Sequence, residues 1–263
     1  MDNNNSTHNF LIIGGTGGIG LAMIQQLLQD NPIATGAGVQ IFATYHNREP
    51  SLQAENLHWL PMDVTEEASI AATIADIKAQ TTQLHWVINA VGLLHTATEG
   101  PEKSIRQLEP EYFMQNMKVN ALPSLLIAKH IKPLLKPAAA TKTATTMTDA
   151  PATIYATISA RVGSITDNRV GGWYSYRMSK AALNMGMKTL SIEWARTLKQ
   201  VCVVVLQPGT VDTELSKPFQ GNVPEEKLFT AEYSAEKLLS VLADMSAEQT
   251  GSFVDWSGAA IPW

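Results

Sequence analysis

Short apolar runs alternate with stretches of helical periodicity along most of this chain. Seven segments have the length and apolar character of strands, at residues 9–13, 39–44, 57–60, 84–90, 153–159, 201–206 and 251–256. Helical periodicity marks residues 20–29, 66–79, 111–135 and 232–245, and a stretch that carries Tyr176 and ends near residue 198. Strands that alternate with helices favour a parallel sheet with helices packed on both faces. We therefore expect an α/β fold with one doubly wound parallel sheet of about seven strands.

The bulk composition agrees with a globular protein. The chain has 263 residues, 45% of them hydrophobic, which is enough to bury a substantial core. It shows no internal repeat and no boundary between two units, so we expect residues 1–263 to form a single domain. Residues 137–153 are rich in Ala and Thr, and we expect a flexible surface loop there.

Charge and cysteine content narrow the possible partners and the compartment. The net charge is −5 and no long Lys/Arg run occurs, which argues against nucleic acid or an anionic membrane surface as the main partner. The most apolar helical stretch, near residues 121–135, is interrupted by prolines and charged residues, so we expect no membrane span. The single cysteine, Cys202, excludes an internal disulfide, and the first residues are polar. We expect a cytoplasmic protein.

A glycine-rich turn, IIGGTGGIG, joins the first expected strand to the first expected helix. It places Gly14, Gly18 and Gly20 in the pattern G-x-x-x-G-x-G. Glycines at such a turn let the backbone approach a pyrophosphate closely, and the following helix N-terminus offers free N–H groups and positive potential to the phosphates. Because the turn lies at the first strand of an alternating pattern, it predicts a Rossmann-like sheet that binds a nucleotide.

The end of the second strand bears on the choice between NAD and NADP. An acidic residue there would bond the ribose 2′-hydroxyl of NAD and repel a 2′-phosphate. This chain reads ATYHNRE, with Tyr45 where the acid would be, followed by His46, Asn47 and Arg48. The sequence therefore favours NADP, with Arg48 as a candidate partner of the 2′-phosphate. The alternative is that Arg48 is only a solvated loop charge.

The stretch YSYRMSK, residues 174–180, sets Tyr176 four residues before Lys180 within an expected helix. Positions four apart share a helix face, so a phenol and an ammonium lie side by side. A tyrosine phenol has an ordinary pKa of about 10, and a neighbouring cation lowers it, which makes Tyr176 a candidate general acid or base. Taken alone, such a pair is more often a packed tyrosine beside a solvated lysine.

Together these motifs resemble those of the short-chain dehydrogenase/reductase family, and the resemblance covers nearly the whole chain. Asp63-Val64 resembles the pair that contacts the adenine ring, and INAVG at 88–92 resembles the segment after the fourth strand. KVNA at 118–121 resembles the segment with a catalytic Asn, and PGTVDT at 208–213 resembles the loop on the nicotinamide side. Within the family, two segments resemble the small C-factor-like branch: SARVGSITDNRVGGWYSYRMSK at 159–180 and the ending IPW.

The resemblance implies a set of site residues. The implied catalytic residues are Tyr176, Lys180, Ser159 and Asn120. The cofactor-binding residues, including those of the glycine turn, would be Gly14, Thr16, Gly18, Ile19, Gly20, Tyr45, His46, Arg48, Asp63, Val64, Asn89, Ala90, Gly92, Tyr176, Lys180, Pro208, Gly209, Val211 and Thr213. The expected cofactor is NADP(H) in preference to NAD(H). No metal is expected, because the histidines lack the mutual spacing of metal ligands.

Two departures from the family pattern affect this site. The family has Asn-Asn-Ala-Gly after the fourth strand, whereas residues 89–92 here are Asn-Ala-Val-Gly. The family also ends its fifth strand with two serines, of which the second is catalytic, and here Ala160 occupies that column. Ser159 is our first candidate for the missing hydroxyl, because a bulge can shift the register at a strand end. Ser164 is the second candidate. If neither serine serves, Tyr176 alone would donate to the oxyanion.

The resemblance implies an NADPH-dependent carbonyl reductase or alcohol dehydrogenase. Tyr176 would protonate the developing alkoxide, and Ser159 would stabilise its charge. Lys180 would hold the nicotinamide ribose, and Asn120 would fix a water for proton resupply. The partner would be a small carbonyl or alcohol compound, which the sequence does not identify. The alternative is a non-enzymatic NAD(P)-binding protein of the C-factor type that signals or senses redox state.

Further expectations concern assembly and the substrate pocket. The resemblance implies a homodimer or homotetramer formed through the long helix and the helix of Tyr176. Residues 214–233 suggest a mobile lid over the substrate. His95 is a candidate substrate contact, although a surface histidine is the more common role. Four aromatic residues could line an apolar pocket or could only pack: Trp173, Tyr174, Phe219 and Phe229.

Overall fold

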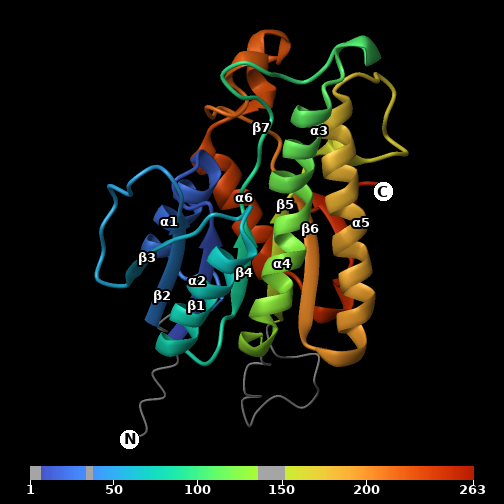
Figure 1. Ribbon diagram of the computed structural model, residues 1–263. Helices are drawn as coiled ribbons and strands as arrows, with labels where there is room; N and C mark the ends of the chain where they lie inside the picture. The colour runs from blue at the N-terminus through green and yellow to red at the C-terminus, as the bar shows by residue number, and fades with distance from the viewer. Residues whose placement is uncertain (1–6, 34–37, 136–151) are drawn as a thin grey trace, which may run out of the picture.

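Seven parallel strands form the central sheet, in the order β3-β2-β1-β4-β5-β6-β9 (Figure 1). The computed structural model describes residues 7–33, 38–135 and 152–263. The strands are β1 (Thr7–Ile13), β2 (Gly38–Tyr45), β3 (Leu57–Pro61), β4 (Trp86–Asn89), β5 (Thr153–Ile158), β6 (Val201–Gln207) and β9 (Ser252–Asp255). The expected α/β class and the seven-stranded parallel sheet are confirmed. The Ala/Thr-rich segment lies almost entirely outside the described residues.

Helices cover both faces of this sheet because successive strand residues point to opposite sides. Phe10 and Ile12 pack with α1 (Gly18–Gln29) and α6 (Ala231–Ala243). Leu11 and Ile13 pack in the other layer, with α2 (Glu67–Gln80), α4 (Leu122–Ile131) and α5 (Tyr174–Thr197). Strands buried on both faces need continuous apolar runs, which explains segments such as VCVVVL in β6.

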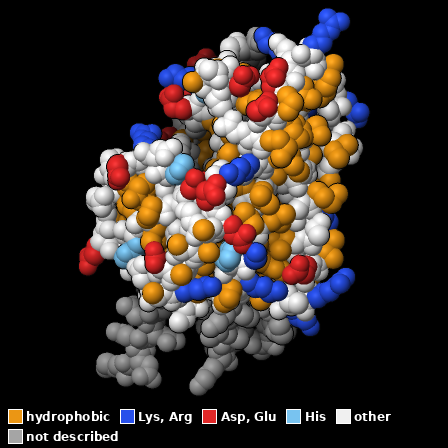
Figure 2. Space-filling model, viewed as in Figure 1, with side chains coloured by type: hydrophobic (Ala, Val, Ile, Leu, Met, Phe, Trp, Pro, Cys, Tyr) orange, Lys and Arg blue, Asp and Glu red, His pale blue; other side chains and the backbone are white. Residues whose placement is uncertain are grey.

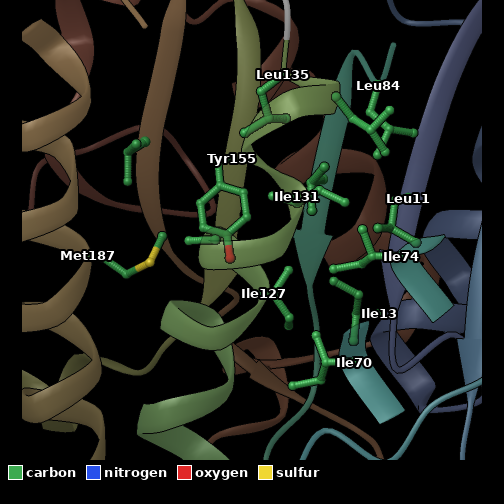
Figure 3. Packing of buried hydrophobic residues seen from close by; sticks show 14 of the residues in the cluster. Leu11, Ile13, Ile70, Ile74, Leu84, Ile127, Ile131, Leu135, Tyr155 and Met187 are labelled. Atoms are coloured by element: carbon green, nitrogen blue, oxygen red, sulfur yellow. The ribbon is translucent and has the colours of Figure 1, made fainter. Parts of the chain in front are cut away.

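The layer of α4 and α5 is anchored by large buried side chains. Figure 3 shows Tyr155 of β5 between Met187 of α5 and Ile131 of α4. The Tyr155 ring lies 5.3 Å from the ring of Trp194, and its hydroxyl donates to the main-chain oxygen of Ser124 in α4. Burying one side chain of this size contributes about 1.5–3 kcal/mol to the free energy of unfolding. This packing fixes α4 and α5 against the sheet.

The helical stretch expected at 111–135 is interrupted. It consists of α3 (Pro110–Asn116), a π-helical turn (Met117–Ala121), α4 and a 3-10 turn (Lys132–Leu134). Pro123 lies in the first turn of α4 and has no N–H to donate to the preceding turn. The wider π turn accommodates this gap, and such turns occur often at functional sites. The π turn carries Asn120.

The loops after the strands meet at the carboxyl edge of the sheet, where ligands of doubly wound folds bind. Residues 210–229 cross this edge and hold β7 (Thr210–Val211), the 3-10 helices Lys217–Asn222 and Glu225–Lys227, and β8 (Leu228–Phe229). Strand β8 pairs in parallel with β7. Three further 3-10 turns occur at Ile105–Gln107, Arg161–Gly163 and Ala247–Gln249. Within the described ranges, every helix is too short or too polar to cross a membrane.

Candidate active site

The glycine turn has the geometry that the sequence predicts. Gly14 has φ of +81°, and a Cβ built there would lie 2.9 Å from Val91 Cγ2. A Cβ on Gly20 would lie 2.3 Å from the carbonyl oxygen of Gly14, which excludes any side chain. Helix α1 starts at Gly18, and its N-cap, Gly17, makes no side-chain cap bond. The turn therefore leaves the first N–H groups of α1 to an anion, which fits the phosphates of a dinucleotide.

The loop after β6 lies against this turn. A Cβ on Gly18 would come within 2.5 Å of Thr213 Cγ2. Gly209 has φ of +82°, and Phe229 would lie 2.5 Å from a Cβ there, so this turn also requires glycine. The carbonyl of Pro208 accepts from the hydroxyl of Ser234 at 2.8 Å, which ties the loop to α6. The two segments that resemble cofactor contacts are thus adjacent.

The segments after β2 and β3 carry the residues that resemble contacts to the adenosine end of a dinucleotide. The Asp63 carboxylate accepts from the N–H of Thr65 at 2.8 Å and from its hydroxyl at 2.7 Å. The hydroxyl bond is the main reason that the pKa of Asp63 lies below its usual value, and His46 Nε2, 3.5 Å away, adds to this effect. Val64 is buried beside it, and Arg48 is exposed after Tyr45, at the end of β2.

Asn89 holds the loop that departs from the family pattern. Its Nδ2 donates to the Ser124 hydroxyl at 2.9 Å, and its Oδ1 accepts from the N–H of Val91 at 3.1 Å. The Ser124 hydroxyl is also 3.0 Å from that of Thr157 in β5. Asn89 therefore turns the chain at Ala90 without the second Asn of the family.

Gly92 marks the point at which the catalytic candidates meet. A Cβ on Gly92 would lie 3.7 Å from Lys180 Nζ, 3.8 Å from Asn120 Oδ1 and 3.8 Å from Leu215 Cδ1. Residues from the loop after β4, the π turn, α5 and the segment after β7 thus surround one small space. These residues are distant in sequence, so the sequence alone could not show this convergence.

Asn120 joins the loop after β4 to α5. Its Oδ1 accepts from the N–H of Leu93 at 2.7 Å, and its Nδ2 donates to the carbonyl of Leu93 at 2.8 Å. The same Nδ2 lies 3.0 Å from the hydroxyl of Ser179, which donates at 2.8 Å to the carbonyl of Tyr176. Asn120 is fully engaged and fixes the geometry around Gly92. Ser179 was missed in the sequence, although it stands beside Lys180 within YSYRMSK.

Tyr176 and Lys180 lie on one face of α5, as their spacing predicts. Lys180 Nζ is 5.8 Å from the centre of the Tyr176 ring and donates to the carbonyl of Ile158 at 3.0 Å. Both side chains are buried, and burial disfavours both charges. Burial lowers the pKa of Lys180 to about 8. Gly163 packs directly on this lysine, since a Cβ there would lie 2.8 Å from Lys180 Cβ.

The pKa of Tyr176 moves in the opposite direction from the one expected. The sequence suggested that Lys180 lowers it, whereas burial of the phenol raises it, and Tyr112 of α3 adds to the effect. The physical reason is that burial removes the phenolate from water and so disfavours its negative charge. Tyr176 therefore stays protonated near neutral pH, which suits a proton donor.

The structure places the two serine candidates in different surroundings. The Ser159 hydroxyl is buried and donates to Asn184 Oδ1 at 2.7 Å. Asn184 lies on α5 about two helical turns after Tyr176. The Ser164 hydroxyl is also buried and accepts from the N–H of Asp167 at 3.1 Å. Neither hydroxyl has the Tyr176 phenol among its hydrogen-bond partners in the described structure.

A row of aromatic rings extends from Tyr176. The Trp173 ring lies 6.2 Å from that of Tyr176 and 5.4 Å from that of Phe219. Phe219 in turn lies 5.8 Å from His95, whose Nε2 is 3.1 Å from the carbonyl oxygen of Glu214. The segment after β7 is thereby attached over the site.

Not every aromatic candidate lies in that row. Phe229 packs instead with Trp256 and Tyr233, at ring distances of 4.8 and 5.0 Å. Tyr174 begins α5 and is partly exposed. Of the four aromatic candidates, Trp173 and Phe219 are the two that belong to the row beginning at Tyr176.

A comparison of the chain with protein families gives one clear result. A profile of the short chain dehydrogenase family matches residues 8–223. Among relatives, 1-hydroxy-2-glutathionyl-2-methyl-3-butene dehydrogenase of Rhodococcus sp. (strain AD45) is 28% identical over 204 residues, which cover 77% of this chain and 78% of the relative. C-signal of Myxococcus xanthus is 34% identical over 106 residues, or 40% of this chain and 58% of the relative.

Solved structures agree with this result over almost the full length. The NADPH-bound carbonyl reductase from chicken fatty liver is 27% identical with a TM-score of 0.80, covering 98% of this chain and 95% of that one. The carbonyl reductase Sniffer of D. melanogaster is 26% identical with a TM-score of 0.80, covering 98% and 100%. The glycine turn, the Tyr176–Lys180 pair and these matches lead to one conclusion: the chain belongs to the short-chain dehydrogenase/reductase family and is an NAD(P)-dependent oxidoreductase acting on carbonyl or CH–OH groups.

Proposed function

We propose that this protein is an NADPH-dependent reductase of small carbonyl compounds. The observation that supports this most is the convergence at Gly92, where Lys180 Nζ and Asn120 Oδ1 meet beside a protonated Tyr176. Two similar structures of this family are carbonyl reductases, and one holds NADPH. The direct test is NADPH oxidation in the presence of aldehydes, ketones and quinones, with the alcohol product identified.

The residues divide the chemistry in a simple way. The bound cofactor supplies a hydride to the carbonyl carbon. Tyr176 gives its hydroxyl proton to the carbonyl oxygen, so that a C–H and an O–H bond form as the C=O π bond is lost. Lys180 would hold the ribose of a bound cofactor and would return a proton to the tyrosinate. Asn120, whose amide is fully engaged by protein partners, keeps the loop after β4 and α5 in register, and solvent would resupply the proton to Lys180.

Ser159 remains our candidate for the hydroxyl that orients the substrate oxygen. Asn184 Nδ2 is the one buried side-chain N or O atom of the described residues that lacks a hydrogen-bond partner. Turning the Asn184 amide over would let Nδ2 donate to Ser159, because amide oxygen and nitrogen are exchanged by that rotation. The serine proton would then be free for a substrate oxygen. This arrangement satisfies the buried donor and gives Ser159 a chemical role.

Ser159→Ala should therefore reduce kcat much more than Ser164→Ala. Loss of one donor to a developing oxyanion costs about a hundredfold to a thousandfold in rate. Steady-state kinetics with one accepted carbonyl and saturating NADPH measures the difference. A larger loss for Ser164→Ala would show that the register assumed for the end of β5 is wrong.

We expect NADPH to bind more tightly than NADH. No carboxylate follows Tyr45 until Glu49, and the exposed Arg48 can pair with a 2′-phosphate. Arg48→Ala should reduce the difference in binding free energy by about 1–2 kcal/mol, the size of a charge-assisted hydrogen bond. Fluorescence titration of both cofactors measures it, with the exposed Arg106→Ala as a control that changes neither affinity. Equal affinities in the wild-type protein would contradict the NADP assignment.

A homodimer or homotetramer is the expected assembly. Figure 2 shows hydrophobic side chains gathered over α3, α4 and α5. These exposed residues are Met114 of α3, Leu122 and Leu125 of α4, and Met178, Met185 and Ile192 of α5. The three on α5 recur every seven positions and share one face of the helix. Such a face suits a second copy of this chain, since closed symmetric dimers are the commonest soluble oligomers.

Met185→Glu should shift the assembly toward the monomer. This residue is 66% exposed, so a carboxylate there is harmless in a monomer but costly when buried between two copies. Light scattering at micromolar concentration measures the mass. Gln25→Glu adds the same charge on an exposed position of α1, on the opposite face of the sheet, and should have no effect. A monomeric wild-type protein would contradict the assembly.

We also propose that residues 1–263 form one NAD(P)-binding domain and that the protein acts in the cytoplasm. The support for a single domain is that seven strands, from β1 to β9, join in one continuous sheet. The buried free Cys202 suits a reducing compartment.

A further inference from the structure

Glu102 is a buried carboxylate that the proposed mechanism does not use. It lies in the loop between β4 and α3, and only 3% of the residue is exposed. Glutamate is almost never buried to this degree unless its charge is compensated. The partners that the structure gives to this carboxylate are donors at the N-terminus of α5.

Both the side chain and the main chain of Glu102 hold the first turn of α5. The N–H of Ser175 donates to the two carboxylate oxygens, at 3.1 and 3.3 Å, and the Ser175 hydroxyl donates to the same carboxylate. The carbonyl of Glu102 accepts from the N–H of Trp173 at 2.5 Å. Trp173 occupies the N-cap position of α5 but makes no side-chain cap bond. The cap is therefore supplied by a residue 73 positions before Ser175.

The turn that Glu102 holds carries the groups closest to the proposed reaction. Tyr176 follows Ser175 directly, and the Trp173 ring packs edge-on against the Tyr176 ring. Trp173 has φ of 54°, in the left-handed region, which is strained for a bulky residue unless its surroundings fix it. The bond to the Glu102 carbonyl holds the main chain of Trp173 in this conformation, and the rings of Tyr176 and Phe219 pack against its side chain.

We propose that Glu102 is a positioning residue for carbonyl reduction, which sets where the Tyr176 hydroxyl and the Trp173 ring meet the substrate. The inference rests on the proposed function. The chain from Asn120 through Ser179 to the Tyr176 carbonyl holds the same turn from its other side. Replacing Glu102 is thus expected to displace the turn without unfolding α5. A displacement of about 1 Å costs about a hundredfold in rate.

The experiment compares the wild type with Glu102→Leu, Glu102→Gln, Ser175→Ala and Glu109→Leu, on one carbonyl that the wild type reduces. Glu102→Leu should lower kcat about a hundredfold and raise the solvent deuterium isotope effect, because proton transfer from a displaced Tyr176 becomes rate-limiting. Its Kd for NADPH should stay within about twofold of wild type, because the glycine turn and Lys180 are unchanged.

The other variants separate positioning from general stability. Glu102→Gln keeps an oxygen that accepts from Ser175 and should return kcat to within about tenfold of wild type. Ser175→Ala removes the hydroxyl hydrogen bond to Glu102 and should lower kcat about three- to tenfold. This variant keeps the test decisive if Glu102→Leu does not fold. Glu109→Leu is the matched control, since Glu109 is exposed before α3 and makes no side-chain cap bond. It should behave as wild type.

Three results would overturn the inference. A wild-type kcat and isotope effect in Glu102→Leu would show that the hydrogen bonds of Glu102 to α5 do not position Tyr176. The proposed function would stand. Parallel losses of kcat and NADPH affinity would show a general loss of structure. If the wild type reduces no carbonyl, the proposed function fails and this inference fails with it.

Discussion

Replacing Tyr176 by Phe is expected to abolish most carbonyl reduction while fold and cofactor binding persist. An ordinary phenol is already protonated near neutral pH, and burial raises the pKa of Tyr176 further, so its hydroxyl is the proton donor that we propose. Removing a general acid costs about a hundredfold to ten-thousandfold in rate, and here the same group also aligns the carbonyl. The ring stays in place against Trp173, so packing is kept. Turnover at saturating NADPH measures the loss, and circular dichroism confirms the fold.

Tyr174→Phe is the matched control for this result. Tyr174 lies two positions earlier on a different face of α5, at the partly exposed start of the helix. It should keep near wild-type turnover. A wild-type rate in Tyr176→Phe would mean that the Tyr176–Lys180 pair is only structural.

Lys180→Met should also be severe, with a loss of at least about a hundredfold in kcat/KM. It removes the cation near the ring of Tyr176 and the donor expected to hold the cofactor ribose. Among the residues that the structure describes, this donor has one acceptor, the carbonyl of Ile158, so its other protons would be available to the proposed cofactor. The double variant with Tyr176→Phe should be little worse than either single one, because residues that act as a unit are not additive.

The same substitution should make the cofactor-free protein more stable. Burial holds the pKa of Lys180 at about 8, below its ordinary 10.5, so the folded state resists the charge that the unfolded chain carries. The cost of the buried charge is fully present below pH 8, falls as pH rises from 8 to 10.5, and is gone above that range. It amounts to about 3 kcal/mol, and the bond lost at Ile158 offsets about 1 kcal/mol.

Urea unfolding of the two proteins checks this account. Lys180→Met should exceed the wild type by about 1–3 kcal/mol at pH 7, and the difference should shrink toward pH 10. A destabilised variant at pH 7 would show that the lysine is compensated by contacts that the structure does not give it.

The sheet could be predicted because its signals are local. In β6, VCVVVL is apolar on both faces, and IIGGTGGIG combines a strand end, a turn and a helix start within nine residues. The order of neighbouring strands follows once the family is known. The spacing of Tyr176 and Lys180 also specifies their shared face, because helix geometry is regular.

Other features depend on contacts that no local pattern reveals. The π turn at Asn120 was missed because side-chain periodicity does not separate it from an α-helix, and Pro123 was read only as an interruption of a membrane span. Glu102 gave no signal, since its partner Ser175 is 73 positions away. The direction of the Tyr176 pKa shift depends on how deeply α5 is buried, which the spacing to Lys180 does not contain.

The most direct test of the account is the absorbance of NADPH in the presence of a panel of aldehydes, ketones and quinones. The account predicts that at least one carbonyl drives NADPH oxidation with an equal amount of alcohol formed, and that Tyr176→Phe stops it. A protein that binds NADPH but oxidises it with no carbonyl would contradict the account. That result would favour a non-enzymatic NAD(P)-binding protein that signals or senses redox state.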